Sequence, residues 1–491
     1  MNPRFEDIPR PSLWKRFLLG GALVVFATAS ATSVAAFREV DRVVNAIKPG
    51  KSLKLVGSIA KAPPGKPQTI MLLGSDRRPP DAKDGGAGMG ARSDTIILVR
   101  LDPEKEATAL MSLPRDLKVQ IPGRGTDKIN AAYELGGAKL TLQTVKLLTG
   151  LQVNHVINVD FQGFKKAVNA IGCVYLDIDR RYFNDSPGYA YIDVRQGYQK
   201  LCGEEALEYA RFRHEDSDLV RGARQQDFLR EAKQQVGVGQ LVKDRERLIR
   251  IFGKYTTSDD ALKTREGILR LLKLAVFSVD QPIREVHFEG RITGGDELTN
   301  TPSYVEASDA TVKKLTAQFL GVEETKGPRG ELEPRRKRRK KAGGDAGLEK
   351  APGPGKDQAI QAIQQGAGGK LPVYYPTVRL RGSLFAGPPR AYRIEALDGK
   401  RHKSYRMVIR RGLIGEYYGI QGTTWQDPPI LESASEERTI GRRTFELHYD
   451  GDRLRIVAWR TRKAVYWVSN TLLQSLTERQ MLGIARSVRL P

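Results

Sequence analysis

Apolar and polar positions alternate along residues 66–320 in a way that predicts strands and helices in turn. Short apolar runs, typical of buried strands, occur at Thr69–Leu73, Thr95–Leu101, Ala107–Leu113, His155–Val159 and Val174–Ile178. Apolar residues recur at helical spacing in 139–148, 161–171, 204–210 and 226–236. This alternation favours an α/β domain with layers of helices around a central sheet.

The pattern changes to a two-residue alternation beyond residue 371. Tyr392 and Ile394 precede the turn formed by Asp398, Gly399 and Lys400, and alternating apolar residues follow it. A second such pair of segments surrounds the turn at 450–452, and a final helix is predicted at 478–488. Paired alternating segments around Asp-Gly turns indicate β-hairpins. We therefore expect a separate C-terminal α+β domain over residues 371–491, with no catalytic constellation of its own.

The segment between these two regions, residues 327–370, has neither pattern. It is rich in Gly, Pro, Gln and Ala and contains the unbroken basic run Arg335–Lys341. Such a composition cannot bury a core and predicts a flexible basic linker. The basic run is either a solvated spacer or a contact for anionic wall polymers or lipid head groups.

One long apolar stretch near the N-terminus predicts a membrane anchor. Residues 17–37 contain no charged side chain and would span about 30 Å as a helix, and Arg4, Arg10, Lys15 and Arg16 precede them. By the positive-inside rule, residues 1–16 stay in the cytoplasm, and everything after a stalk at 38–65 lies outside the cell membrane. A cleaved signal peptide is the alternative, because Ala29–Ala31 and Ala35 offer small-residue sites.

The composition predicts a polyanionic partner and one disulfide. The net charge is +24 over 491 residues, which indicates nucleic acid, anionic lipid or an anionic polymer as partner. Export makes nucleic acid a poor candidate. Cys173 and Cys202 both fall in the exported part, where an even pair predicts a disulfide rather than two free thiols.

Charged residues gather where the predicted strands begin and end. Arg92 and Asp94 precede one strand, and Arg115 follows the next. Other charged and polar residues stand near strand or helix ends at Asp76, Arg78, Lys128, Asn130, Arg211, Arg213, Arg221, Arg224 and Gln225. If the strands share one sheet, their ends converge on the edge where α/β proteins bind ligands.

The residue types in this set indicate a pyrophosphate site. Guanidinium groups match phosphate oxygens and keep their charge. The ligand would repel Asp76 and Asp94 unless a hard cation lay between them, and Mg²⁺ (or Mn²⁺) suits that role. The alternative is a set of surface salt bridges.

The segments GSDRR, ARSDTIILV, SLPRD, DKINAAYELGG, FQGF, AIGCVYLDI, LCGEEALEYARFRH and SDLVRGARQQ resemble, in order, the motifs of the LytR–CpsA–Psr family. The resemblance covers about Thr69 to Leu320. It implies a three-layer α/β/α catalytic domain with a central mixed sheet, here at 66–326. It also implies a membrane-anchored phosphotransferase that moves a glycopolymer from a polyprenyl-pyrophosphate carrier to peptidoglycan, at the C6 hydroxyl of N-acetylmuramic acid.

The resemblance also implies roles for single residues. Asp76 and Asp94 are expected to bind Mg²⁺ and to act in catalysis. The other expected catalytic residues are Arg92, Arg115, Arg211 and Arg213, and those expected to bind substrate are Arg78, Lys128, Asn130, Arg221, Arg224 and Gln225, with Arg221, Arg224 and Gln225 closing the rim. The acceptor's proton would go to Asp76, Asp94 or His214. Apolar faces at 140–148 and 161–168 either line a pocket for the prenyl tail or belong to the core.

The sequence departs from the family pattern at two positions. Cys173 and Cys202 stand in the segments Gly-Cys-Val and Leu-Cys-Gly, where family members often have Gly-Gly-Val and Leu-Asp-Gly. Two such substitutions favour the disulfide. Two other functions stay open: a lipid pyrophosphatase that uses water as acceptor, and a non-enzymatic protein that binds anionic wall polymer.

Overall fold

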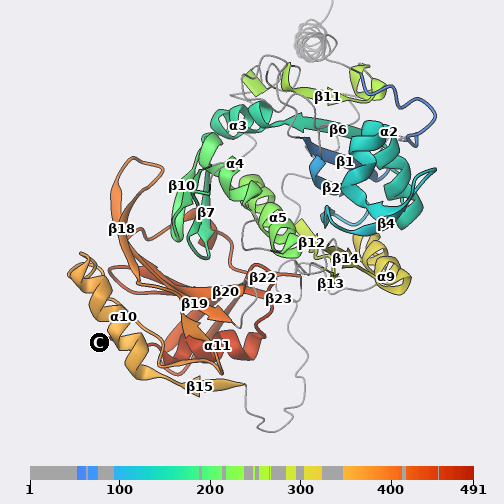
Figure 1. Cartoon of the computed structure of the whole chain (residues 1–491). Coiled ribbons are helices and arrows are strands. Elements are labelled where there is room, and N and C mark those ends of the chain that lie inside the picture. Colours follow the sequence, from blue (N-terminus) through green and yellow to red (C-terminus); the bar gives the residue numbers. More distant parts are fainter. Residues whose placement is uncertain are drawn as a thin grey trace, which may run out of the picture.

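The protein has an N-terminal domain and a C-terminal domain that pack against each other (Figure 1). The computed structural model describes residues 52–61, 63, 65–75, 93–186, 191–212, 217–236, 247–248, 251, 254–264, 266, 283–294, 303–322, 347–411, 416–451 and 453–491. For residues 75, 93 and 94, the structure describes the backbone and not the side chain. The predicted cytoplasmic segment, the predicted anchor at 17–37 and the basic run Arg335–Lys341 lie outside the described residues.

A mixed central sheet organises the N-terminal domain, as the sequence predicted. Its strands lie in the order β11-β6-β1-β2-β3-β12. Strand β1 runs antiparallel to β2 and parallel to β6, and β3 runs parallel to β12. The bounds are β1 Gln68–Ser75, β2 Ser93–Asp102, β3 Ala107–Leu113, β6 His155–Asp160, β11 Thr256–Ser258 and β12 Ile283–Val286.

Helices α2 (Ile129–Thr149) and α9 (Asp309–Leu320) cover one face of this sheet. Alternate strand residues such as Met71 and Leu98 pack there against Leu142 of α2 and Phe319 of α9, because successive side chains of a strand point to opposite faces. Val145 of α2 is also buried in this core, whereas Leu147, on the face considered for a prenyl tail, is 59% exposed.

Helix α5 (Asp218–Gln235) packs against strand β3 of the central sheet. A Cβ on its Gly222 would lie 3.2 Å from Ser112 Oγ. Glycine therefore permits the close contact that holds the start of α5 against the end of β3.

The chain joins the N-terminal domain earlier than the predicted boundary at residue 66. Leu55, in the expected stalk, is fully buried in the same core as Met71. The backbone N–H groups of Leu53 and Ala60 donate to the carbonyls of Ser258 and Val153. The stalk assignment is therefore wrong for residues 52–60, because Leu53, Leu55 and Ile59 pack into the sheet's core.

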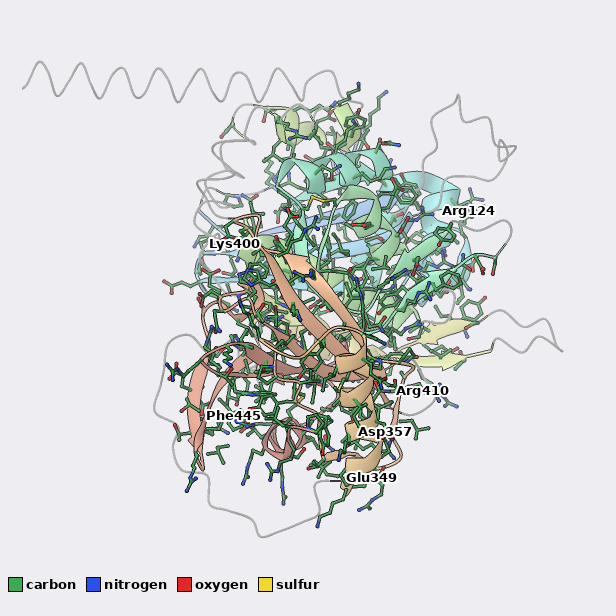
Figure 2. The ribbon with its side chains drawn as sticks, turned by 90° about the vertical axis from the view of Figure 1, so that its left-hand side faces the viewer. Arg124, Glu349, Asp357, Lys400, Arg410 and Phe445 are labelled. Atoms are coloured by element: carbon green, nitrogen blue, oxygen red, sulfur yellow. A yellow bond between two sulfur atoms is a disulfide. The ribbon has the colours of Figure 1, made fainter. Side chains whose placement is uncertain are left out.

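A smaller unit with its own core extends the N-terminal domain. Hairpin β7 (Val174–Ile178) and β10 (Gly197–Leu201) packs with helices α3 (Phe161–Ala170) and α4 (Gly203–Arg211). Val168, from the second face considered for a prenyl tail, is buried in this core. The predicted Cys173–Cys202 disulfide is present and joins the start of β7 to the start of α4, with Cα atoms 4.6 Å apart (Figure 2).

Short paired strands and one 3₁₀ helix complete this domain. They are β4 Lys118–Ile121 with β5 Gly125–Lys128, β8 Tyr182–Asn184 with β9 Ile192–Val194, β13 Arg291–Thr293 with β14 Tyr304–Glu306, and η1 Asp260–Lys263.

The C-terminal domain is an antiparallel sheet with two helices. The two predicted hairpins are confirmed as β18–β19 and β22–β23, and the predicted final helix is α11. The bounds are β15 Leu348–Lys350, α10 Pro352–Gln364, β16 Val378–Leu380, β17 Leu384–Phe385, β18 Arg390–Glu395, β19 Arg401–Arg411, β20 Glu416–Thr423, η2 Pro429–Leu431, β21 Glu436–Ile440, β22 Arg443–Asp450, β23 Arg453–Arg460, β24 Val465–Ser469 and α11 Glu478–Ser487.

The predicted linker at 327–370 is wrong in its second half. Strand β15 pairs with β16, and Ala359 and Ala362 of α10 are buried in the C-terminal core. Their spacing of three residues places both small side chains on one helix face. The low apolar content of this segment hid a helix that packs through alanines.

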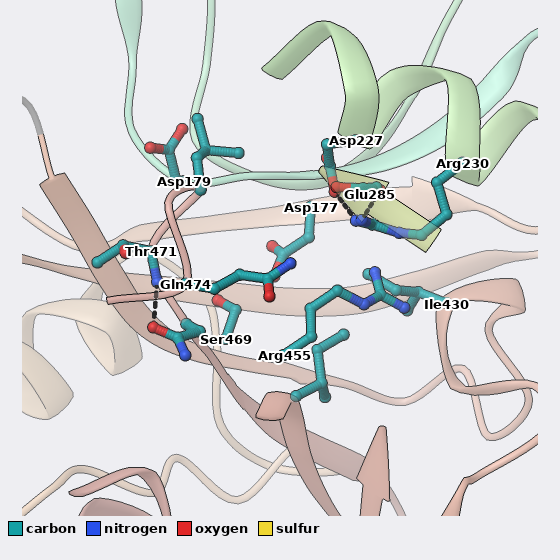
Figure 3. Close-up of a pocket in the computed structure, with 13 residues that line it drawn as sticks. Asp177, Asp179, Asp227, Arg230, Glu285, Ile430, Arg455, Ser469, Thr471 and Gln474 are labelled. Atoms are coloured by element: carbon teal, nitrogen blue, oxygen red, sulfur yellow. Dashed lines mark hydrogen bonds and ion pairs between the residues drawn. The ribbon is translucent and has the colours of Figure 1, made fainter. Parts of the chain in front are cut away.

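The C-terminal domain is not separate, which corrects the sequence expectation. Tyr175 and Tyr198 of the β7–β10 hairpin belong to one apolar cluster with Trp425 and Trp467. Asp177 on β7 accepts hydrogen bonds from Arg406 Nη1 at 3.1 Å and Trp467 Nε1 at 2.9 Å. Figure 3 shows Asp177 among the polar side chains that both domains contribute. The shared core fixes the two domains relative to each other.

Candidate functional site

Strand ends meet at one edge of the central sheet. Ser75 at the end of β1 pairs with Ser93 at the start of β2, across an irregularity in the register, and Asp160 at the end of β6 pairs with Ser75. Leu113 at the end of β3 pairs with Ile96. The predicted convergence of strand ends is therefore confirmed for the backbone.

A cluster of five charged side chains lies at this edge, and we call it the edge cluster: Arg115, Asp116, Lys128, Asp218 and Arg221. Arg115 Nε lies 3.7 Å from Asp116 Oδ1 and 3.9 Å from Asp218 Oδ1. Lys128 Nζ lies 3.1 Å from Asp116 Oδ1, and Arg221 Nη2 lies 2.8 Å from Asp218 Oδ1. Three cations thus share two carboxylates.

Local structure explains how these residues meet. The backbone N–H of Asp116 donates to Asp218 Oδ2 at 2.9 Å, which joins the loop after β3 to the first turn of α5. Asp218 is favourable there because the helix dipole attracts negative charge at an N-terminus. The N–H of Asn130 donates to the carbonyl of Arg115 at 3.2 Å, so the start of α2 supports the same loop.

The carboxyl of Asp116 is held in an unfavourable place for a charge. Burial raises its pKa, and the nearby charge of Asp218 raises it further, against the opposing effects of Arg115 and Lys128. Two partly buried carboxylates this close need cations around them. Asp116 and Asp218 therefore keep the three cations of the edge cluster near the sheet edge, and the five side chains counted by themselves carry one net positive charge.

Arg224 and Gln225 lie beneath the edge, which corrects the predicted rim position. Arg224 is fully buried and donates to the carbonyls of Tyr209 at 2.9 Å and Phe212 at 2.8 Å. Gln225 donates to Thr95 Oγ1 at 2.9 Å. Arg221 is also buried. Arg224 and Gln225 therefore join α4, α5 and β2 behind the residues that they were expected to accompany.

Arg211 lies at the end of α4 and is exposed. Its guanidinium carbon lies 4.1 Å from the centre of the Phe161 ring, the first residue of α3. Cation–π contact orients such a side chain without neutralising its charge. Arg211 is therefore available to an anion.

Several predicted site residues cannot be placed. Asp76, Arg78, Arg92, Arg213 and His214 lie outside the described residues, as does the side chain of Asp94. The backbone of Asp94 lies in β2 beside the end of β1.

One group of described residues has the donor types for a metal ion: Glu285, His287 and Asp450. It lies between the domains rather than at the sheet edge. The guanidinium of Arg230 already donates to Glu285 and lies 3.8 Å from Asp450 Oδ2. A cation from the protein itself thus occupies this place, and a second one would be repelled.

The sequence reasoning missed the roles of Asp116 and Asp218. Both stand inside quoted motifs, SLPRD and SDLVRGARQQ, directly beside residues that were singled out. An Asp next to an Arg, with a second Asp at a predicted helix start, was the available signal.

No helix among the described residues is both long and apolar enough to cross a membrane.

Comparison with known proteins gives consistent relatives. The profile of the LytR_cpsA_psr family matches residues 31–319. The polyisoprenyl-teichoic acid–peptidoglycan teichoic acid transferase TagT of Bacillus subtilis is 34% identical over 227 residues, covering 44% of this chain and 68% of that protein. The transferase TagU of Oceanobacillus iheyensis is 34% identical over 260 residues, covering 51% and 75%.

An uncharacterised Staphylococcus aureus protein is 30% identical over 256 residues, covering 51% of this chain and 61% of its own length. Among solved structures, TagT bound to LI-WTA is 24% identical, with a TM-score of 0.42, and covers 55% of this chain and 98% of that one. B. subtilis TagV is 26% identical, with a TM-score of 0.41, and covers 52% and 96%. The family profile ends at residue 319, before the C-terminal sheet, and each of these relatives and structures covers 44–55% of this chain.

Proposed function

This chain belongs to the LytR_cpsA_psr family, and on that premise we propose that it is a membrane-anchored, extracytoplasmic phosphotransferase. It moves a glycopolymer from a polyprenyl-pyrophosphate carrier to peptidoglycan, with the C6 hydroxyl of N-acetylmuramic acid as acceptor. Residues 17–37 form the anchor, and the N-terminal domain is a three-layer α/β/α catalytic domain.

The observation that carries this proposal is the edge cluster, within the region that the family profile matches. A net positive set of side chains at converging strand ends suits a diphosphate. Arg115 and Lys128 supply the charge, while Asp116 and Asp218 hold them in position.

Phosphoryl transfer needs the growing negative charge neutralised and the acceptor held in line. Arg115, Lys128 and Arg211 would bind the oxygens of the pyrophosphate and stabilise polyprenyl phosphate as it leaves. The acceptor hydroxyl loses its proton as the new phosphodiester bond forms. Asp76, Asp94 and His214 are the candidates to take that proton.

The proposal includes a divalent ion shared by Asp76 and Asp94. Asp94 lies at the register irregularity opposite the end of β1, and Asp76 follows that end directly. Mg²⁺ or Mn²⁺ held there would draw charge from the phosphate oxygens.

The test is a reconstituted transfer reaction. Purified full-length protein in detergent is incubated with a polyprenyl-pyrophosphate oligosaccharide and peptidoglycan, and covalent sugar on the peptidoglycan is measured. Phosphate release without sugar transfer would show a hydrolase instead. Binding without any turnover would show a wall-polymer-binding protein.

Arg115→Ala tests the edge cluster within the same assay. Removing one cation that stabilises the transition state is expected to lower kcat by about 10²–10³-fold. Arg124→Ala is the matched control, because Arg124 is exposed in the turn between β4 and β5 (Figure 2). Equal activity of the two variants would remove Arg115 from the catalytic site.

A further inference from the structure

Aromatic and arginine side chains from both domains meet behind the end of α4, and we call them the ring cluster: Arg180, Tyr182, Phe212, Arg224 and Tyr417. The guanidinium carbon of Arg180 lies 4.7 Å from the centre of the Tyr182 ring, and that of Arg224 lies 4.6 Å from the same centre. Both guanidinium carbons also lie near the Phe212 ring, at 5.3 and 5.8 Å from its centre. Cation–π contacts of this kind are strongest when the groups are shielded from water.

Close packing holds the ring of Phe212 in one place. The side chains of Tyr182, Phe212 and Arg224 are almost fully buried. The rings of Tyr182 and Phe212 meet edge to face, with their centres 5.0 Å apart. The hydroxyl of Tyr182 donates to Asp179 Oδ1 at 2.6 Å, and Arg224 donates to the carbonyl of Phe212 at 2.8 Å. Side chains packed and hydrogen-bonded in this way have little freedom to move.

Phe212 is the residue at which α4 ends. Its backbone leaves the helix, with a φ of −51° and a ψ of 134°, while its N–H still donates to the carbonyl of Glu208 at 3.0 Å. Arg211 is the last residue of the helix and is proposed above to bind the pyrophosphate. The direction of a side chain depends on the backbone that carries it. A shift of Phe212 would therefore redirect the guanidinium of Arg211.

The C-terminal domain contributes one member of the ring cluster. Tyr417 lies in β20, where it pairs with Arg410 of β19. The centre of its ring lies 5.2 Å from the guanidinium carbon of Arg180. Arg180 also donates to the carbonyl of Arg181 at 3.4 Å, so its backbone neighbour helps to hold it. Contact is thus continuous from β20 of one domain to the end of α4 in the other.

We propose that Tyr417 is a positioning residue for the transfer reaction. It holds Arg180 against Phe212 and thereby keeps Arg211 directed at the pyrophosphate. This inference rests on the proposed function, because the group that is positioned acts in that reaction. It gives the C-terminal domain, which the family profile does not reach, a part in the chemistry of the N-terminal domain. Small displacements of a catalytic group are costly because the reaction depends on its orientation.

The variants Tyr417→Leu and Tyr417→Phe test which property of the side chain matters. Leucine keeps an apolar side chain but has no ring to attract a guanidinium, so Tyr417→Leu is expected to lower kcat about fivefold. KM should change by less than about twofold, because the ground state still binds Arg115 and Lys128. Tyr417→Phe keeps the ring and should retain kcat within about twofold of the wild type.

Tyr392→Leu is the matched control. Tyr392 also belongs to the C-terminal domain, and its hydroxyl donates across the contact between the domains to the carbonyl of Tyr198 at 2.9 Å. This variant disturbs that contact away from the ring cluster. It should lower the melting temperature at least as much as Tyr417→Leu does, but leave kcat unchanged. Equal losses of kcat in the two leucine variants would overturn the proposal, as would an equal loss in Tyr417→Phe.

Hydrogen exchange tests the same path without turnover. Amide exchange is measured by mass spectrometry on the full-length protein in detergent. Tyr417→Leu is expected to speed exchange in residues 207–213 about fivefold, because the end of α4 opens more often once Phe212 is less firmly held. Tyr392→Leu should speed exchange in residues 197–201 instead. Unchanged exchange of 207–213 in Tyr417→Leu would overturn the proposal.

Should Tyr417→Leu fail to fold, pentafluorophenylalanine replaces it at position 417. This residue keeps the size of a phenylalanine ring but reverses the charge of its face, so it should repel Arg180 and give the same losses. Wild-type kcat and exchange in that variant would equally overturn the proposal.

The two readouts separate this inference from the proposed function. If the wild type transfers no sugar, the proposed function fails, while the exchange of residues 207–213 still decides whether Tyr417 holds the end of α4. If the wild type transfers sugar and Tyr417→Leu matches its kcat, the role of Tyr417 alone fails.

Discussion

The edge cluster and the ion pairs between the domains are built from the same residue types, but cations outnumber carboxylates in the first and carboxylates outnumber cations in the second. At the sheet edge, Arg115, Lys128 and Arg221 share Asp116 and Asp218. Between the domains, Arg230 and Arg455 lie among the carboxylates of Asp227, Glu231, Glu285 and Asp450. Figure 3 shows Arg230 directed at Asp227 and Glu285.

The difference shows which arginines can bind a ligand. An excess of cations attracts an external anion, whereas an excess of carboxylates consumes each guanidinium inside the protein. Burial raises the pKa of Glu285 to about 8 and that of Asp227 to about 6, against the opposing effect of Arg230. This contrast supports the proposal that the edge cluster serves catalysis, while the ion pairs between the domains serve stability.

Among the changes to the ion pairs between the domains, replacing Arg230 should have the largest effect on the free energy of unfolding. Arg230→Ala leaves buried carboxylates without their cation and is expected to lower the free energy of unfolding by about 3–5 kcal/mol. Urea unfolding followed by tryptophan fluorescence measures it, because Trp467 lies in the contact between the domains.

Arg438→Ala is the control, since Arg438 also pairs with two carboxylates, Glu436 and Glu478, but is partly exposed. Its expected loss is about 1 kcal/mol or less. Arg115→Ala should lower the stability less than Arg230→Ala does, because Lys128 and Arg221 still pair with Asp116 and Asp218, while it abolishes most activity. A similar loss of stability in all three variants would erase the distinction between the two regions.

The disulfide should have the next largest effect, because it supports the hairpin that carries Asp177 to the C-terminal domain. Removing a bridge across 29 residues is expected to cost about 2–4 kcal/mol. The variant Cys173→Gly/Cys202→Ser suits the backbone, since Cys173 has a φ of 68°, which favours glycine.

Thermal unfolding with and without a reducing agent measures this effect. The wild type should lose melting temperature when reduced, and the double variant should not respond to the reductant. A wild type indifferent to reduction would show that packing alone holds the β7–β10 hairpin in place.

A change of one pH unit should have the smallest effect on stability. The folded-state pKa of Glu285, about 8, lies above its ordinary value of 4.5. A proton is therefore bound more tightly in the folded state, and its stabilising contribution is complete below pH 4.5 and lost as the pH rises through about 8. Asp227 acts in the same direction, while His287, with a pKa lowered to about 4, stays neutral.

Glu285→Gln should flatten this decline, because a neutral amide still accepts a hydrogen bond from Arg230. Urea unfolding at three pH values between about 5.5 and 8.5 compares the variant with the wild type, and the two slopes are expected to differ by about 1 kcal/mol per pH unit. If stability fell with pH equally in the variant and the wild type, a group other than Glu285 would bind the stabilising proton.

Much of the fold followed from local pattern. The apolar pattern predicted β1, β2, β3 and β6 of the central sheet and both C-terminal hairpins, and helical spacing predicted α3, α4 and α11, whereas the short strands β11 and β12 were not predicted. Helix α2 extends further than predicted, because Gly136 and Gly137 interrupt the periodic pattern with non-helical backbone angles. The alanine-packed α10 and the buried Leu55 escaped detection because neither segment has a strong apolar signal.

The candidate site was predicted in part. The motif residues Arg115, Lys128 and Arg221 do meet at the sheet edge, together with the unanticipated Asp116 and Asp218. Arg224 was misplaced because an arginine beside catalytic residues looks the same in sequence whether it binds a ligand or two backbone carbonyls.

By itself, the sequence determined the family, the strand and helix periods, the pairing of its two cysteines and the positive charge of the chain. These follow from residue type and from spacing over a few positions. Only the tertiary structure decided which arginines are consumed by the protein and which lie at the sheet edge. The reason is distance along the chain: Arg406 meets Asp177 across 229 residues, and only the packed domains bring the two together.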